Sequence, residues 1–288
     1  MRGLKEYIIE GIFDTDEDTI DKSIKDQIKQ FLKDNFKGYS SCKISRKPNT
    51  NGKYEVYSSK NINVKNYKIT SLTNGLFIWT TVDSDFNCEN CHSLTTLEGS
   101  PKEVGGDFYC SGCHSLTTLE GAPKEVGSGF YCNYCDSLTS LEGAPEKVGG
   151  DFICSSCKSL ISLKGAPKVV GGDFRCSYCD LLTSLEGAPK EVGSGFYCNT
   201  CHSLKTLEGA PEKVGGDFRC SYCDLLTSLE GAPKEVGGYF SCSRCKALIS
   251  LEGAPKEVGG NFSCVLCHKV FYEEDVIKVS SVKGNIIV

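Results

Sequence analysis

The sequence contains little methionine, tryptophan or histidine, and it has no long hydrophobic run. Among its 288 residues are one Met, one Trp and four His. A membrane-spanning helix needs roughly 18 consecutive apolar residues, so no membrane association is expected. Positively charged residues are also outnumbered: the chain has 32 Lys and Arg and 37 Asp and Glu, which gives a net charge of −5. Binding to nucleic acid needs clustered Lys and Arg, so no nucleic acid is expected as a partner.

The first residues lack the pattern of a secretory signal peptide. MRGLKEYIIEG holds only short apolar clusters, without a charged segment followed by a continuous apolar one. We therefore predict a cytoplasmic protein whose thiols stay reduced. The odd number of cysteines, 19, also means that no internal disulfide scheme could use all of them.

What the sequence does contain is a repeat of 22 residues, in which most of the 19 Cys and 31 Gly fall. The best copy, residues 130–151, reads FYCNYCDSLTSLEGAPEKVGGD. The repeated aromatic positions are Phe86, Phe108, Phe130, Phe152, Phe174, Phe196, Phe218, Phe240 and Phe262. Every Cys except Cys42 belongs to a C-x-x-C pair of this unit. Self-similarity at such a short period is typical of a solenoid, because each unit can bury its apolar residues only against its neighbours.

Within one unit, the alternation Phe130-Tyr131-Cys132 predicts a short strand with Phe130 and Cys132 inward and Tyr131 outward. Cys135, Leu138 and Leu141 follow at three-residue steps, which suits a tightly curving coil. The recurring Gly and Pro predict turns and argue against a helix on the return path. The predicted fold is thus a mainly β repeat solenoid of 22-residue coils.

The spacing F-x-C-x-x-C-x-x-L-x-x-L resembles the leucine-rich repeat in its cysteine-containing bacterial form. It is most similar to the repeat proteins of bacteria and their large phages that carry the 22-residue SLTSLEGAPKEVGGDFxCxxC unit. The resemblance covers residues 64–270 and implies binding of a ligand or partner on a repeated surface, without catalysis. Two features depart from the leucine-rich pattern: Gly127 replaces the usual leading aliphatic residue, and the step from the second Cys to Leu is three residues instead of two. A generic parallel β-helix is therefore the alternative fold.

The ends of the chain predict additional segments. We expect a leader or short helix at 1–13, an α+β cap at 14–63, the solenoid at 64–270 and a C-terminal cap at 271–288. The cap should contain an amphipathic helix at 18–36 and a hairpin that turns at Asn49–Gly52. Residues 64–85 read as a degenerate first coil with Val64 at the Phe position, followed by regular coils from residue 86. Ile8-Ile9-Glu10-Gly11 is similar to the leaders that a prohead protease trims in large tailed phages, which would give a mature N-terminus at Gly11 and a virion location.

The C-x-x-C pairs leave a metal-binding alternative open. Two pairs on adjacent coils would lie about 5 Å apart and could supply four sulfur ligands to zinc. The candidate ligands are Cys88, Cys91, Cys110, Cys113, Cys132, Cys135, Cys154, Cys157, Cys176, Cys179, Cys198, Cys201, Cys220, Cys223, Cys242, Cys245, Cys264 and Cys267. The preferred interpretation of the cysteines needs no cofactor. One Cys of each pair packs in the core as Leu would, and the other satisfies backbone groups in the turn.

Two further functions fit the sequence poorly. Four pairs spell C-x-x-C-H, the attachment motif of c-type haem, but the same position holds Asp or Lys in the other units and no signal for export precedes them. No Ser-His-Asp set, carboxylate pair or phosphate-binding loop stands out, so we do not expect an enzyme.

The positions that vary between repeats predict the binding surface. They are the residue after each Phe and the residue before the second Cys, both of which should face outward. Tyr and Arg, which are enriched in the energetically dominant parts of protein interfaces, gather there in the central units. The predicted partner-binding residues are Tyr109, Tyr131, Tyr134, Arg175, Tyr178, Tyr197, Arg219 and Tyr222. The partner is expected to be an unidentified protein or glycan. The alternative role of these aromatic side chains is to stack on one another and stabilise the solenoid.

Overall fold

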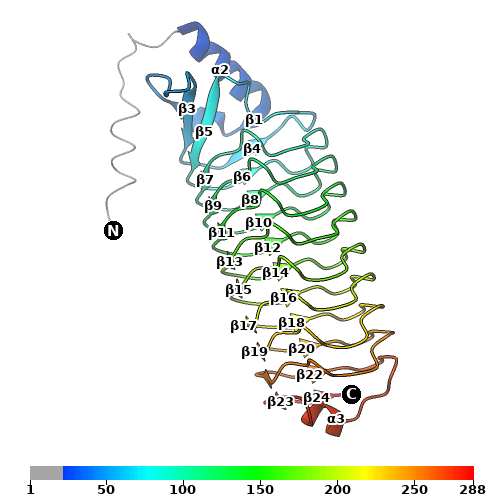
Figure 1. Ribbon diagram of the computed structural model, residues 1–288. Coiled ribbons are helices and arrows are strands. Elements are labelled where there is room, and N and C mark those ends of the chain that lie inside the picture. Colours follow the sequence, from blue (N-terminus) through cyan, green and yellow to red (C-terminus); the bar gives the residue numbers. More distant parts are fainter. Residues whose placement is uncertain (1–21) are drawn as a thin grey trace.

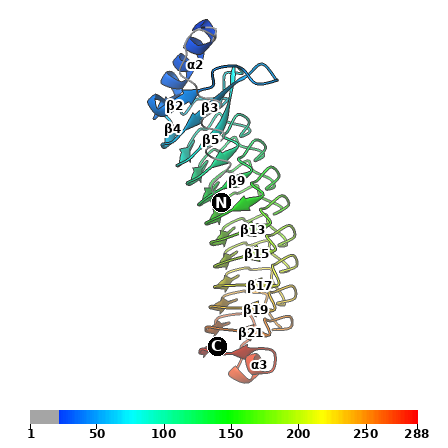
Figure 2. The same cartoon turned by 90° about the vertical axis from the view of Figure 1, so that its left-hand side faces the viewer.

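A computed structural model describes residues 22–288 and shows a solenoid whose successive coils stack along one axis (Figure 1). Each regular coil contributes one short strand to each of two sheets, and both sheets run the length of the molecule (Figures 1 and 2). The predicted solenoid of 22-residue coils is therefore confirmed, and the description as a parallel β-helix fits this fold as well. The predicted leader and its cleavage at Gly11 lie outside the described residues.

Sheet A carries the Phe strands. In spatial order it contains β1 (Phe36–Lys37), β4 (Ile62–Val64), β6 (Phe86–Asn87), β8 (Phe108–Tyr109), β10 (Phe130–Tyr131), β12 (Phe152–Ile153), β14 (Phe174–Arg175), β16 (Phe196–Tyr197), β18 (Phe218–Arg219), β20 (Phe240–Ser241), β22 (Phe262–Ser263) and β24 (Ile286–Ile287). Neighbouring strands pair in parallel and in register, as in Phe130 with Phe152, and only β1 runs antiparallel to its neighbour β4.

Sheet B carries the Val strands. In spatial order it contains β2 (Cys42–Ile44), β3 (Tyr54–Ser58), β5 (Phe77–Val82), β7 (Glu103–Val104), β9 (Glu125–Val126), β11 (Lys147–Val148), β13 (Val169–Val170), β15 (Glu191–Val192), β17 (Lys213–Val214), β19 (Glu235–Val236), β21 (Glu257–Val258) and β23 (Ser281–Val282). The predicted hairpin is confirmed, because β2 and β3 pair antiparallel around the turn at Asn49–Gly52.

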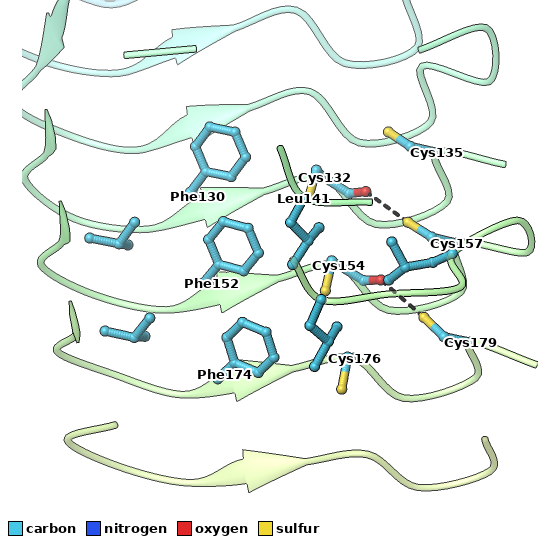
Figure 3. Packing of buried hydrophobic residues seen from close by; sticks show 14 of the residues in the cluster. Phe130, Cys132, Cys135, Leu141, Phe152, Cys154, Cys157, Phe174, Cys176 and Cys179 are labelled. Atoms are coloured by element: carbon cyan, nitrogen blue, oxygen red, sulfur yellow. Dashed lines mark hydrogen bonds between the residues drawn. The ribbon is translucent and has the colours of Figure 1, made fainter. Parts of the chain in front are cut away.

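The core is a stack of identical side chains. Phe130, Cys132, Cys135, Leu138 and Leu141 are all fully buried, as predicted. In Figure 3, Phe152 and Cys154 of the next coil stack directly against Phe130 and Cys132. The Phe rings stack nearly parallel, for example with 5.1 Å between the centroids of Phe108 and Phe130. In-register pairing forces this repetition, since each residue of a coil lies beside its own equivalent in the next.

Two glycines in each unit allow the coils to approach closely at the turns. Gly143 has φ of +87°, and a Cβ there would lie 2.3 Å from the backbone nitrogen of Glu120 in the coil before. A Cβ on Gly149 would lie 2.2 Å from the carbonyl oxygen of Gly127. Any side chain at either position would push adjacent coils apart, so the turns require glycine.

The N-terminal end of the solenoid is covered by α2 (Lys22–Asn35), which packs Ile28 and Leu32 into the core. A 3₁₀ turn, η2 (Tyr39–Ser41), leads from β1 to β2. The Phe position of the first, degenerate coil is occupied by Ile62, which pairs with Phe86, so the assignment of Val64 to it was wrong. Ile62 takes the Phe position because this irregular coil is two residues longer than the later ones. Val64 instead pairs with Phe36 of β1.

At the C-terminal end, α3 (Glu273–Ile277) interrupts the repeat. β23 and β24 then pair with β21 and β22, so both sheets continue beyond residue 270. Neither helix in residues 22–288 is long and apolar enough to cross a lipid bilayer.

Candidate functional site

In the six coils from Phe108 to Phe218, the residues after Phe form what we call the strand row, on the outer face of sheet A: Tyr109, Tyr131, Ile153, Arg175, Tyr197 and Arg219. All of them are half-buried because they pack on one another. The rings of Tyr109 and Tyr131 stack with centroids 4.8 Å apart. The guanidinium of Arg175 lies 4.1 Å from the centroid of the Tyr197 ring, a cation–π distance, and Arg219 lies 5.7 Å from the same ring.

The Asp residues directly before Phe hold the polar groups of the strand-row side chains in place. The Tyr109 hydroxyl donates to Oδ2 of Asp107 at 2.7 Å, and Arg219 Nη2 donates to Oδ2 of Asp217 at 2.6 Å. The second oxygen of each carboxylate receives a backbone N–H from the next coil, from Gly129 for Asp107 and from Tyr239 for Asp217. The sequence interpretation missed this role, although the signal was present as an Asp that recurs directly before Phe.

These hydrogen bonds control the ionisation of the carboxylates. Partial burial would raise the pKa of Asp173, but hydrogen bonds from Gly195, Ser194 and Arg175 outweigh it and hold the pKa below its ordinary value of 3.8. The hydrogen bond to Asp107 raises the pKa of Tyr109 above its ordinary value of 10.0. The Asp173 carboxylate is thus charged and the Tyr109 hydroxyl neutral at pH 7.

In two coils, glycine replaces the Asp that directly precedes Phe, and a tyrosine ring occupies the place of the missing side chain. A Cβ on Gly129 would lie 2.4 Å from the hydroxyl oxygen of Tyr131, and a Cβ on Gly195 would lie 2.4 Å from the Tyr197 ring. Glycine at these two positions therefore leaves room for the Tyr131 and Tyr197 rings. Tyr109 instead follows an Asp, whose carboxylate accepts its hydroxyl hydrogen bond.

The residues before the second Cys form a different surface, which we call the corner row: Tyr134, Ser156, Tyr178, Thr200, Tyr222 and Arg244. Each of them adopts the left-handed conformation, with φ of 59° at Tyr134, 61° at Tyr178 and 62° at Tyr222. The three tyrosines are 56 %, 57 % and 44 % exposed, in that order. They lie on every second coil, and only Tyr222 is covered by a cation, with the Arg244 guanidinium 5.4 Å from its centroid.

The residues after the second Cys follow the same two-coil alternation and form the ion row: Asp136, Lys158, Asp180, His202, Asp224 and Lys246. A carboxylate lies in each coil that carries a corner tyrosine, and a Lys or His lies in each coil between. Lys158 Nζ contacts Asp136 Oδ2 at 3.0 Å, and Lys246 Nζ contacts Asp224 Oδ2 at 3.1 Å. His202 Nδ1 lies 3.1 Å from the same Asp224 oxygen. Most of the ionic groups along this edge thus pair with each other.

The structure separates the predicted partner-binding residues into two groups. Tyr109, Tyr131, Tyr197, Arg175 and Arg219 lie in the strand row, where they contact their neighbours. Tyr134, Tyr178 and Tyr222 lie in the corner row and extend into solvent. Sequence reasoning found both rows but did not separate them, and it did not anticipate the left-handed backbone.

The C-x-x-C pairs have two distinct roles. All 19 cysteines are free thiols. From Cys113 onward, the second Cys of a pair donates its S–H to the carbonyl oxygen of the first Cys in the preceding coil, as from Cys157 Sγ to Cys132 O at 3.2 Å (Figure 3). The first Cys packs in the core, and burial raises the pKa of Cys154 and Cys176 well above 9.0.

The same geometry bears on the predicted metal alternative. Zinc would need deprotonated sulfurs from two pairs turned toward one point. Instead the second thiols point at carbonyl groups, and burial favours the protonated form of the first. In residues 22–288, His, Cys, Asp and Glu side chains nowhere gather in groups of three or more that could hold a metal ion.

Comparison of the chain with protein-family models, with curated proteins and with solved structures found no match. The functional interpretation therefore rests on the surface described above.

Proposed function

We propose that this protein is a non-catalytic binding or scaffold protein that recognises a protein or glycan through the strand row and the corner row. The observation that carries the proposal is the set of three exposed tyrosines, Tyr134, Tyr178 and Tyr222, held in left-handed backbone. A bulky residue at positive φ is disfavoured by roughly 1–2 kcal/mol, and the equivalent position in another coil holds Gly112. Strain kept at an exposed aromatic position favours a functional role over a purely structural one.

The strand row supports the proposal by its rigidity. Its tyrosine and arginine side chains are already ordered by stacking and by hydrogen bonds to the carboxylates below, so binding to them would cost little conformational entropy. Tyr and Arg dominate interface hot spots for this reason and because each has a large contact area. The proposed surface thus combines the ordered side chains of the strand row with the exposed tyrosines of the corner row.

The resemblance to leucine-rich-repeat-like proteins of bacteria and large phages agrees with this function, since it implies recognition on a repeated surface. A reducing cytoplasm is the proposed location, because a core built from free thiols is stable against oxidation there. A virion location is the alternative, and a mature N-terminus at Gly11 would support it.

The test compares two triple variants in capture experiments with lysate proteins and with an array of glycans. One variant carries Tyr134→Ala, Tyr178→Ala and Tyr222→Ala. The control carries Tyr39→Ala, Tyr67→Ala and Tyr272→Ala, three tyrosines that are also exposed but lie outside both rows. We expect the first variant to lose a ligand that the control and the natural chain retain. Equal capture by all three chains would overturn the proposal.

A further inference from the structure

The corner tyrosines recur at a fixed distance along the solenoid. Parallel strands lie about 4.8 Å apart, so tyrosines on every second coil are separated by about 9.6 Å. The small side chains of Ser156 and Thr200 stand between them. Across the three tyrosines the row spans four coil steps, or about 19 Å. A partner that contacts all three rings therefore needs a matching repeat of its own.

Among peptide conformations, polyproline II matches this distance. It has three residues per turn and a rise of about 3.1 Å, so every third side chain returns to the same face after about 9.3 Å. Over the three tyrosines the mismatch stays below about 1 Å. An extended strand repeats after about 6.8 Å. Seven residues of an α-helix span about 10.5 Å, a mismatch that grows to about 2 Å over the row.

The chemistry of the corner also suits this conformation. Polyproline II makes no internal hydrogen bonds, so its carbonyl groups need donors from the surface on which it lies. Asn133 and Asn199 directly flank the corner row, and their side-chain oxygens already accept hydrogen bonds from Ser111 and Ser221. Their NH₂ groups donate no hydrogen bond within the described part of the chain and are available to a ligand carbonyl. The tyrosine hydroxyls add further donors.

We propose that the corner row binds a proline-rich segment in the polyproline II conformation, with every third residue packed against Tyr134, Tyr178 and Tyr222. This inference rests on the proposed function and names its partner. Flat aromatic rings that receive preformed proline-rich helices are a recurring mode of peptide recognition. The rigid peptide loses little entropy on binding, which suits a surface that lacks a deep pocket.

The binding probe is a fluorescent proline dodecamer, measured by anisotropy against a Gly-Ser dodecamer of equal length. We expect the proline peptide to bind the natural chain and the Gly-Ser peptide to bind at least tenfold more weakly. Tyr178→Ala should weaken proline binding about tenfold, and Tyr67→Ala should leave it unchanged, because Tyr67 is 57 % exposed but lies outside the row. Failure of the proline peptide to bind better than Gly-Ser would overturn the inference, as would insensitivity to Tyr178→Ala.

Two deletions that keep the same two tyrosines test whether spacing determines binding. Removal of 152–195 takes out two consecutive coils and leaves Tyr134 and Tyr222 two coils apart. Removal of 152–217 takes out three coils and leaves the same two tyrosines on adjacent coils, about 4.8 Å apart. Both deletions join equivalent positions of the repeat, and circular dichroism checks that both chains fold. We expect the first deletion variant to bind proline more tightly. Equal binding or the reverse order would overturn the inference.

Competition with chitohexaose and cellohexaose separates the inference from the proposed function. If a sugar polymer binds in a Tyr178-dependent manner and the proline peptide does not, the partner-binding surface stands and the polyproline II assignment falls. If the triple corner variant behaves as the natural chain in every capture experiment, both fall together.

Discussion

The two cysteines of a repeat differ in what surrounds their sulfur atoms. Cys154 is fully buried among apolar side chains, whereas Cys157 is equally buried but donates its S–H to Cys132 O at 3.2 Å. The pair therefore combines an apolar core residue with a donor that satisfies a backbone carbonyl of the preceding coil. A serine hydroxyl can replace the donor but is poorly suited to the apolar position.

We predict different costs for the same substitution at these two sites. Cys154→Ser should destabilise the chain by about 2 kcal/mol, because it places a polar hydroxyl where the Cys154 thiol packs among apolar side chains. Cys157→Ser should cost less than about 1 kcal/mol, since its hydroxyl can still donate to Cys132 O. Urea unfolding followed by circular dichroism measures both. Equal losses of stability would contradict the division of roles.

The left-handed backbone at the corner gives a second prediction at the scale of one residue. Tyr178→Gly removes the steric cost of a side chain at φ of 61° and should raise the free energy of unfolding by up to about 1 kcal/mol. Tyr178→Ala keeps a Cβ at this φ and should give no such gain. Chemical denaturation distinguishes the two variants. A loss of stability in the Gly variant would show that the ring contributes packing energy that outweighs the strain.

Strands of two residues are too short to hold neighbouring coils by themselves, and side-chain ladders reinforce them. Asp173 accepts the backbone N–H of Gly195 at 2.7 Å and is paired with Arg175. The bonded carboxylate connects one coil to the next beside the Phe strands. This ladder, together with the thiol ladder inside the coil, explains how such short strands keep their register.

We predict that Asp173→Ala destabilises the solenoid by about 1–2 kcal/mol, because it leaves the N–H of Gly195 without its acceptor. Asp173→Asn should recover part of this loss, since an amide oxygen can accept the same hydrogen bond but cannot pair with Arg175 as an ion. Thermal unfolding of the two variants provides the comparison. Equal stability of the Ala variant and the natural chain would show that the carboxylate is not required between coils.

The solenoid as a whole contains many buried thiols, and their ionisation should lower the free energy of unfolding at alkaline pH. Burial raises the pKa of Cys179 and of Cys245 from the ordinary 9.0 to about 12. Most other core thiols shift in the same direction. Cys113 and Cys267 are exceptions, and a hydrogen bond from the Cys242 thiol lowers the pKa of Cys267 to about 7.

We predict a steep loss of stability as the pH rises above 9. Between pH 9 and pH 12 the unfolded chain releases the protons of these thiols while the folded chain keeps them, so each such thiol lowers the free energy of unfolding by up to about 1.4 kcal/mol per pH unit. Below pH 9 both states hold the protons and the contribution is complete. Urea midpoints measured from pH 7 to pH 11 test this. A midpoint that stays constant above pH 9 would contradict buried, protonated thiols.

From the sequence we could predict the 22-residue period, the buried set of Phe, Cys, Leu and Val, the hairpin and the amphipathic helix. The repeat was predictable because in-register stacking places every residue beside its own equivalent, so a repeat in sequence becomes a repeat in space. The Phe position of the irregular first coil was misassigned to Val64, since the repeat gives no guide where coil length changes.

Which outward residues face solvent depends on how the coils stack, and this could not be predicted from the sequence. Tyr131 and Tyr134 look equivalent in sequence, yet one ring lies flat along the sheet above Gly129 and the other extends from a left-handed turn. The structure also shows which group accepts the hydrogen bond of the second thiol. It is a carbonyl 25 residues earlier in the chain. Local sequence fixes whether a side chain points inward or outward. Its contacts depend on the neighbouring coils, which lie a full repeat away along the chain.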